Sequence, residues 1–137
     1  MARSFLDTNI LLYCDDRADS RKQAIAVKSW AQLRLSGEGV ISIQVLQEYF
    51  LNATRKLSLD PALARRRLEQ HAQFQVVIPS VSLVLAAIDL TRLVQISFWD
   101  ALIVEAARSA SCEQLLTEDL QHGQIISGVR VVNPFSE

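Results

Sequence analysis

Phe5-Leu6-Asp7-Thr8-Asn9 shows how the chain is organised, because two apolar residues end in an acid and a polar turn follows. The apolar pair is typical of a short buried strand, and the polar triplet is typical of a helix start. Further short apolar runs lie at 40–43, 75–78, 114–117 and 129–132, and segments of helical apolar period lie at 20–35, 46–57, 60–71, 82–93 and 98–110. Strands that alternate with helices predict an α/β fold: a three-layer α/β/α sandwich with a mostly parallel central sheet.

The length and charge of the chain limit what it can be. Its 137 residues match one domain, spanning residues 1–137, and half of them are hydrophobic, which excludes wholesale disorder. The 14 Lys and Arg residues nearly balance the 15 Asp and Glu residues. This balance excludes a strongly polybasic nucleic-acid binder. It does not exclude a nuclease with an acidic site.

The cysteines and the apolar segments bear on where the protein works. Cys14 and Cys112 lie far apart and form no CxxC or Cys/His pattern, which suggests free thiols in a reducing compartment. No apolar stretch reaches the ~18 residues that span a bilayer. The first residues lack the apolar core of a signal peptide. We therefore expect a cytoplasmic protein with no membrane partner.

Four acidic residues fall at or near the C-terminal ends of the expected strands. They are Asp7, Glu48, Asp100 and Asp119. In a mostly parallel sheet these ends meet at one edge, where ligands bind. Glu48 points away from the apolar stripe of its own helix, so it is expected to face either solvent or a cleft.

Each acid also has a structural interpretation. Asp7 could cap the helix that follows it, and Asp100 fits a capping box with Ser97. Glu48 could be a solvated helix residue, and Asp119 an ordinary loop acid. The coincidence of four acids favours function, since clustered carboxylates repel one another unless a cation lies between them. Mg²⁺ and Mn²⁺ prefer oxygen ligands and support phosphodiester hydrolysis, which is the chemistry we expect.

Four ordered segments resemble the PIN-domain family. Segment 5–11 looks like the opening of a PIN domain, 97–103 resembles the segment of its third acid, 115–120 that of its fourth, and 129–135 its last strand. Their order and spacing extend over essentially the whole chain. The chain looks most like the VapC-like toxin ribonucleases of bacterial and archaeal toxin–antitoxin pairs.

This resemblance implies a function and a set of site residues. It implies a Mg²⁺- or Mn²⁺-dependent endoribonuclease that acts on RNA, forms a homodimer, and is inhibited by a cognate antitoxin in its cleft. Asp7, Glu48, Asp100 and Asp119 match the four acids, as metal ligands and catalytic residues. Thr117 matches a hydroxyl that supports the fourth acid, and Glu118 is its neighbour. Asn9 is expected to hydrogen-bond the backbone of its turn.

Two other functions stay open at this point. One is a non-catalytic PIN domain that binds RNA or protein. The other is an Asp-based phosphatase or phosphotransfer protein built on Asp7. A haloacid-type phosphatase would need a second Asp where this chain has Asn9, and a receiver would need a late Lys, whereas no Lys follows Lys56.

The remaining basic and aromatic residues are interpreted as structural. The Arg triplet at 65–67 could contact RNA phosphates, but a solvated helix face is the favoured interpretation. Both histidines, His71 and His122, are expected at the surface. The aromatic residues expected in the core or at an interface, rather than as base-stacking platforms, are Trp30, Phe50, Phe74 and Trp99.

Overall fold

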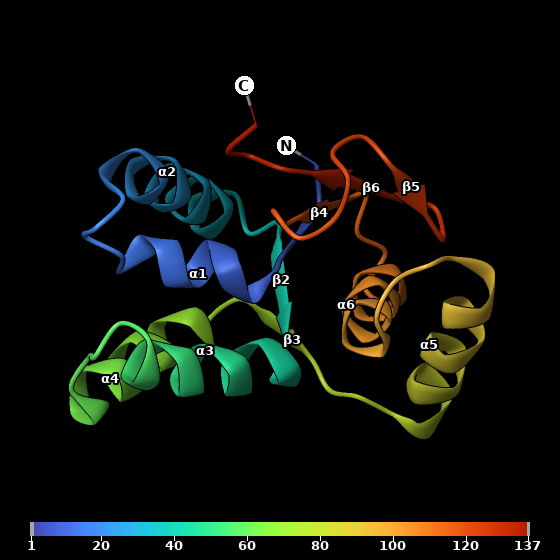
Figure 1. The fold of residues 1–137 in the computed structure, drawn as a ribbon, viewed down its shortest axis with the longest axis horizontal. Coiled ribbons are helices and arrows are strands. Elements are labelled where there is room, and N and C mark those ends of the chain that lie inside the picture. Colours follow the sequence, from blue (N-terminus) through green and yellow to red (C-terminus); the bar gives the residue numbers. More distant parts are fainter. Residues whose placement is uncertain (1, 137) are drawn as a thin grey trace.

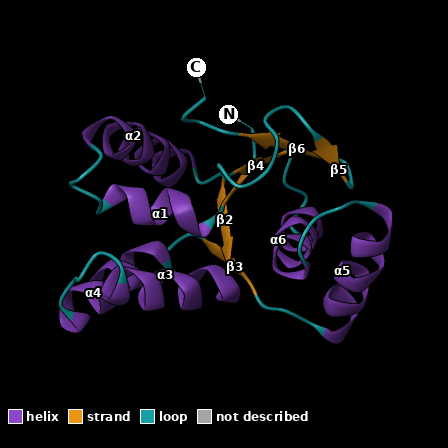
Figure 2. Cartoon of the chain, in the orientation of Figure 1, coloured by secondary structure: helices purple, strands orange, loops and turns teal. Residues whose placement is uncertain are grey.

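The computed structural model describes residues 2–136 and has a six-stranded sheet between two groups of helices (Figure 1). The strands are β1 (Ser4–Leu6), β2 (Gly39–Ser42), β3 (Gln75–Val77), β4 (Gln114–Leu116), β5 (Ile125–Ile126) and β6 (Val129–Val132). The helices are α1 (Thr8–Cys14), α2 (Ser20–Ser36), α3 (Ile43–Arg55), α4 (Pro61–His71), α5 (Val81–Leu93) and α6 (Phe98–Ser109). Helices α1 to α4 lie on one side of the sheet, and α5 and α6 on the other (Figure 2).

The sheet has the order β3-β2-β1-β4-β6-β5, and all pairings but the last are parallel. The predicted α/β/α sandwich with a mostly parallel sheet is therefore confirmed. The central position of β1, between β2 and β4, brings the start of the chain beside residues more than 100 positions later. Ligands of parallel sheets collect where the C-terminal ends of such strands meet.

Strand β5 was not predicted. It is antiparallel to β6 and only two residues long, too short to stand out as an apolar run. Ser127 and Gly128 join the two strands, and both have positive φ, 50° and 80°. Two consecutive positive φ values are what a tight hairpin needs, so the Ser-Gly pair between apolar residues was the available signal.

Helix starts follow the side-chain chemistry of the residue before each helix. Ser42 leaves β2 in extended conformation and its Oγ accepts a hydrogen bond from the N–H of Val45. Ile43 therefore begins α3. The sequence analysis had placed it at the end of the strand. Ser80 and Ser97 cap α5 and α6 in the same way. These caps fix where each helix leaves the sheet and hence where the acids sit.

The positions of four rings test the sequence interpretation, which was wrong for His71 and correct for Phe74. His71 is only 3% exposed, not at the surface, and its Nδ1 accepts a hydrogen bond of 3.0 Å from Trp30 Nε1–H. Phe74 is buried, whereas Trp99 is 62% exposed and so is not a core residue. Phe50 is also exposed. Burial of His71 lowers its pKa to about 4, which keeps it neutral.

The helices were also compared with the length and apolar composition of a membrane span. Over residues 2–136 no single helix meets both requirements. Only α5 and α6 taken together do so, and they are bent by 119° relative to each other.

Candidate active site

The candidate site begins where β1 and β4 end side by side. Leu6 pairs with Leu116 in the parallel register, and the N–H of Asp7 donates to the carbonyl of Leu116 at 3.0 Å. This contact brings Asp7 and Thr117 together at the same edge of the sheet. Asp119 follows two residues later, and Asp100 approaches from the first turn of α6.

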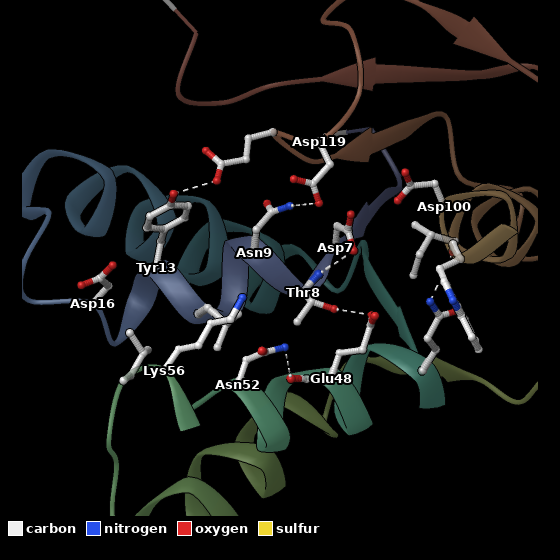
Figure 3. Close-up of a pocket in the computed structure, with 16 residues that line it drawn as sticks. Asp7, Thr8, Asn9, Tyr13, Asp16, Glu48, Asn52, Lys56, Asp100 and Asp119 are labelled. Atoms are coloured by element: carbon white, nitrogen blue, oxygen red, sulfur yellow. Dashed lines mark hydrogen bonds between the residues drawn. The ribbon is translucent and has the colours of Figure 1, made fainter. Parts of the chain in front are cut away.

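Three of the predicted acids converge at this edge. Asp7, Asp100 and Asp119 each offer a carboxylate oxygen, and these atoms all lie within 4.8 Å of one another. Asp7 is buried, Asp100 half-buried and Asp119 exposed, so the cluster opens from the core toward solvent. Figure 3 shows the three side chains at one end of a cleft of about 440 Å³. The sequence analysis predicted that these acids meet at one edge of the sheet, and these three do so.

Asp7 is a helix cap and a member of the cluster at once. Its carboxylate accepts from the N–H of Thr8 at 2.7 Å and from Thr117 Oγ1 at 2.9 Å. Burial raises its pKa to about 7 against these two hydrogen bonds, and the charges of Asp119 and Glu48 raise it further. The capping interpretation is therefore correct for the backbone, and it leaves a buried carboxyl that a neighbouring cation would ionise.

Thr117 and Asn9 link the acids. The fully buried Thr117 hydroxyl donates to Asp7 and accepts from Asn9 Nδ2 and from the N–H of Asp119, both at 3.1 Å. Asn9 Nδ2 also donates to Asp119 Oδ2 at 3.1 Å. Asn9 was expected to bond the backbone of its own turn. Its amide instead bridges two side chains about 110 residues away, which no local pattern could indicate.

Glu48 faces the cleft, one of its two predicted environments. Its Oε1 accepts a hydrogen bond of 3.0 Å from Thr8 Oγ1, and the carboxylate is half-buried (Figure 3). It lies outside the three-acid group. Its charge still acts there, since it contributes to the raised pKa of Asp7.

Asp100 occupies the third position of α6. Its N–H donates to Ser97 Oγ at 3.0 Å, which is the serine half of the predicted capping box. Burial raises the pKa of the Asp100 carboxyl, a hydrogen bond from Ser97 opposes this, and the charge of Asp119 adds to the rise. The start of α6 thus points a carboxylate at its two partners.

The family comparison agrees with this geometry. The sequence model of the PIN domain matches residues 4–125, which include all four acids and their supporting residues. The chain belongs to the PIN-domain family.

Solved structures of toxins and of toxin–antitoxin complexes have a similar fold. VapC20 of Mycobacterium tuberculosis, described as a toxin that cleaves the sarcin–ricin loop, has a TM-score of 0.69 at 20% identity, over 85% of this chain and 91% of that one. A toxin–antitoxin complex from Klebsiella pneumoniae gives 0.69 at 22% identity, over 96% and 97%. DNA-bound VapBC from Salmonella typhimurium gives 0.68 at 18%, over 96% and 97%. No curated protein sequence matches this chain.

Glu118 of the PIN domain is directed away from the acid cluster. Its carboxylate accepts from Tyr13 Oη and from Lys22 Nζ, both at 2.7 Å. Lys22 Nζ also lies 4.8 Å from the centre of the Tyr13 ring and 5.4 Å from that of Phe135. Sequence reasoning missed Lys22 and Tyr13, because they come from α2 and α1 and share no spacing with Glu118.

The donor set of the PIN domain fits a hard divalent cation. Its three clustered side chains supply only carboxylate oxygens, which Mg²⁺ and Mn²⁺ prefer. Among residues 2–136, the ion pairs involve other acids: Glu118, Glu69, Asp15 and Glu105. The three carboxylates thus lack a balancing side chain, and a cation would relieve their mutual repulsion.

Proposed function

We propose that this PIN domain is a metal-dependent endoribonuclease that hydrolyses RNA phosphodiesters as the toxin of a toxin–antitoxin pair. One observation carries the proposal: the carboxylates of Asp7, Asp100 and Asp119 lie within 4.8 Å of one another with no ion-pair partner among residues 2–136. The sarcin–ricin loop cleavage named for VapC20, a protein of the same fold, supports RNA as the substrate.

The residues have separate roles in this proposal. Asp7, Asp100 and Asp119 hold Mg²⁺ or Mn²⁺, and Glu48 contributes from the wall of the cleft. A bound ion of this kind neutralises charge on a phosphoryl group and lowers the pKa of water. Thr117 and Asn9 hold the carboxylates of Asp7 and Asp119 in place through their hydrogen bonds.

Glu118 has a different place in the proposed site. Its ion pair with Lys22 keeps a further negative charge turned away from the metal ligands. The carboxylate therefore supports the site through the position of the loop that carries Asp119, and not as a ligand. This refines the role that the family resemblance implied.

An antitoxin and a second copy of the chain are the protein partners of the proposal. The Klebsiella and Salmonella structures are toxin–antitoxin complexes, which supports a cognate antitoxin here. Helix α5 exposes Val81, Leu85 and Leu93, an apolar surface that fits a homodimer. Light scattering at micromolar concentration checks the dimer. Cys14 and Cys112 are both free thiols, in agreement with the cytoplasm as the site of action.

The test of the function is Asp100→Asn. The change is nearly isosteric and keeps the N–H that bonds Ser97, so unfolding should cost no more than about 1 kcal/mol extra. RNA cleavage should fall by about 100-fold or more, because a lost ligand charge acts on the transition state. The purified, antitoxin-free protein is incubated with total RNA and Mg²⁺ or Mn²⁺, and new RNA ends are mapped by sequencing.

EDTA provides the control for this experiment. Wild-type protein should produce new ends with the metal and none with EDTA. Equal cleavage by Asp100→Asn, or cleavage that survives EDTA, contradicts the metal-dependent mechanism. A wild-type protein that leaves total RNA intact favours the non-catalytic binding module.

A further inference from the structure

The cleft extends well beyond the three-acid cluster. Asp7, Asp100 and Asp119 lie at one end, and Asn52, Lys56 and Asp16 line the other (Figure 3). A metal centre and one scissile phosphate would occupy only the first end. The remaining length has the form expected for neighbouring nucleotides of a bound strand.

Trp99 lies at the acid end of the cleft. It precedes Asp100, lines the cleft, and is 62% exposed although it is the largest type of side chain. Its indole contacts the Phe98 ring edge-on at 5.4 Å, and its carbonyl accepts from Gln44 Nε2 at 3.3 Å. The first turn of α6 is therefore anchored to α3, and the ring it carries is positioned but uncovered.

The cleft continues past Trp99 into an apolar pocket of about 360 Å³. Trp99 and Gln44 line both spaces, so the two are contiguous. Val77, Leu83 and Leu102 supply the apolar wall of the second pocket. An apolar wall beside polar side chains such as Gln44 is suited to a nucleobase, which has a π-face and hydrogen-bonding edges.

Lys56 is the single cation that lines the cleft within residues 2–136. It is exposed, caps the C-terminal end of α3, and takes part in none of the ion pairs among those residues. The other charged residues of the lining are all acidic: Asp7, Asp16, Glu48, Asp100, Glu118 and Asp119. Lys56 is therefore the lining residue whose charge can contact a phosphate of the strand.

We propose that Trp99 stacks on a base beside the scissile phosphate and that Lys56 contacts a phosphate further along the bound strand. The inference rests on the proposed ribonuclease function and assigns two residues that would position its substrate. A single strand can splay a base onto an aromatic ring, whereas a duplex keeps its bases stacked and paired. Trp99 is thus a base-stacking platform in this proposal. The sequence analysis had favoured a core or interface position for it.

Binding is measured with a labelled single-stranded RNA of twelve nucleotides, by anisotropy, with Ca²⁺ in place of Mg²⁺ to limit cleavage. Trp99→Ala should weaken binding by about tenfold, as expected for one lost stacked base, and Trp99→Phe should stay within about threefold. A duplex of the same sequence should bind wild type at least about tenfold more weakly. Equal binding of Trp99→Ala and wild type, or no binding of the single strand, overturns the proposal.

Tryptophan fluorescence gives a second readout, since the chain has only Trp30 and Trp99. Single-stranded RNA should quench wild-type emission, and the quenching should disappear in Trp99→Phe, which retains only the Trp30 signal. Quenching that persists in Trp99→Phe places the RNA elsewhere and overturns the proposal. Light scattering of Trp99→Ala is the control for a role in dimerisation. If the wild type is a dimer and this variant is not, Trp99 is an interface residue and the proposal is overturned.

The lysine has its own matched control. Lys56→Met should reduce affinity about threefold and lower the slope of log affinity against log salt by about 0.7, the value for one phosphate contact with a single strand. Arg66→Met, which changes another exposed cation, on α4 and outside the cleft, should alter neither the affinity nor the slope. Equal effects of both changes overturn the assignment of Lys56.

The two proposals fail separately. Trp99-dependent binding of RNA without any metal-dependent cleavage would refute the nuclease and leave the single-strand site. Metal-dependent cleavage with an unchanged KM in Trp99→Ala would refute the single-strand site and leave the nuclease.

Discussion

Helix α1 has an aspartate at each end, and the two carboxylates lie in opposite electrostatic surroundings. Asp7 caps the N-terminus, where the helix dipole favours an acid, yet it faces other carboxylates and burial raises its pKa to about 7. Asp15 caps the C-terminus, where the dipole opposes an acid. It accepts hydrogen bonds from Tyr49 Oη and from Arg67 Nε, the latter at 3.2 Å.

The surroundings of Asp7 are those of a candidate binding site, whereas the surroundings of Asp15 are those of a structural contact. The Asp15 carboxylate meets a hydroxyl donor and a cation, Tyr49 and Arg67, so its charge is balanced by neighbouring side chains. Around Asp7 the negative charges accumulate without a cationic side chain. Such an imbalance is costly to the folded protein, and this is typical of places where a ligand supplies the missing charge.

The sharpest contrast pairs Asp7→Asn with Asp15→Asn. The first change should reduce RNA cleavage by about 100-fold or more, since it removes a proposed metal ligand. The second should leave the cleavage rate within about threefold, because Asp15 only holds α1 against α3 and α4. Initial rates on one RNA that the wild type cuts measure both. A comparable loss in the two variants would show that α1 acts only as a scaffold.

The pH dependence of unfolding should distinguish the two ends next. The folded-state pKa of Asp7 is raised from 3.8 to about 7, so its stabilising contribution is complete below pH 4 and is lost as the pH rises to 7. Asp7→Asn should therefore gain stability relative to wild type over this range, by about 2–4 kcal/mol at 1.36 kcal/mol per pKa unit. Urea unfolding in EDTA between pH 4.5 and 8 measures the difference.

The pH dependence that His71 of α4 contributes should have the opposite sign. The pKa of His71 is lowered from 6.5 to about 4, so its contribution is complete above pH 6.5 and is lost as the pH falls toward 4. Asp7→Asn removes the titration of Asp7. The free energy of unfolding of this variant should therefore decrease as the pH falls from 6.5 toward 4. A free-energy difference between variant and wild type that stays constant with pH would contradict the burial of the Asp7 carboxyl.

Much of the fold, and less of the site, could be predicted from the sequence. Strands and helices follow from short-range patterns, and the direction of Glu48 follows from the helical period. The burial of His71 did not, because its partner Trp30 lies 41 residues away on another helix. The pairing of Glu118 with Lys22 joins residues 96 apart. Acids at strand ends are locally visible, whereas the side chains that support them are brought in by packing.

Tyr49→Phe tests the balanced end of α1 with a smaller effect. It removes the hydroxyl that donates to the Asp15 carboxylate and keeps the ring, which packs edge-on at 4.6 Å from His71. We expect a loss of about 1.5–3 kcal/mol of unfolding free energy, typical of a hydrogen bond to a charged group, and no change in cleavage. Thermal unfolding and cleavage rates are measured on the same preparation. A stable variant with impaired cleavage would contradict the structural role.

Lys22→Met should have the smallest effect. Its ion pair with Glu118 is partly exposed and should contribute no more than about 1 kcal/mol to stability. The freed Glu118 carboxylate adds charge beside Asp119, so cleavage should fall by about threefold, and Glu118→Gln in the same chain should restore it. A loss of cleavage that Glu118→Gln does not restore would assign Lys22 a direct role in the cleft.

The pairing of β1 with β4 also sets when the acid cluster can form during translation. Thr117 and Asp7 are 110 residues apart, and a nascent chain that stops before β4 has no edge at which to collect its acids. At about 5–20 residues per second, roughly 5–20 s separate the synthesis of the first acid from that of the last. Until the residues of β4 and Asp119 have been made, the growing polypeptide therefore lacks the complete acid cluster.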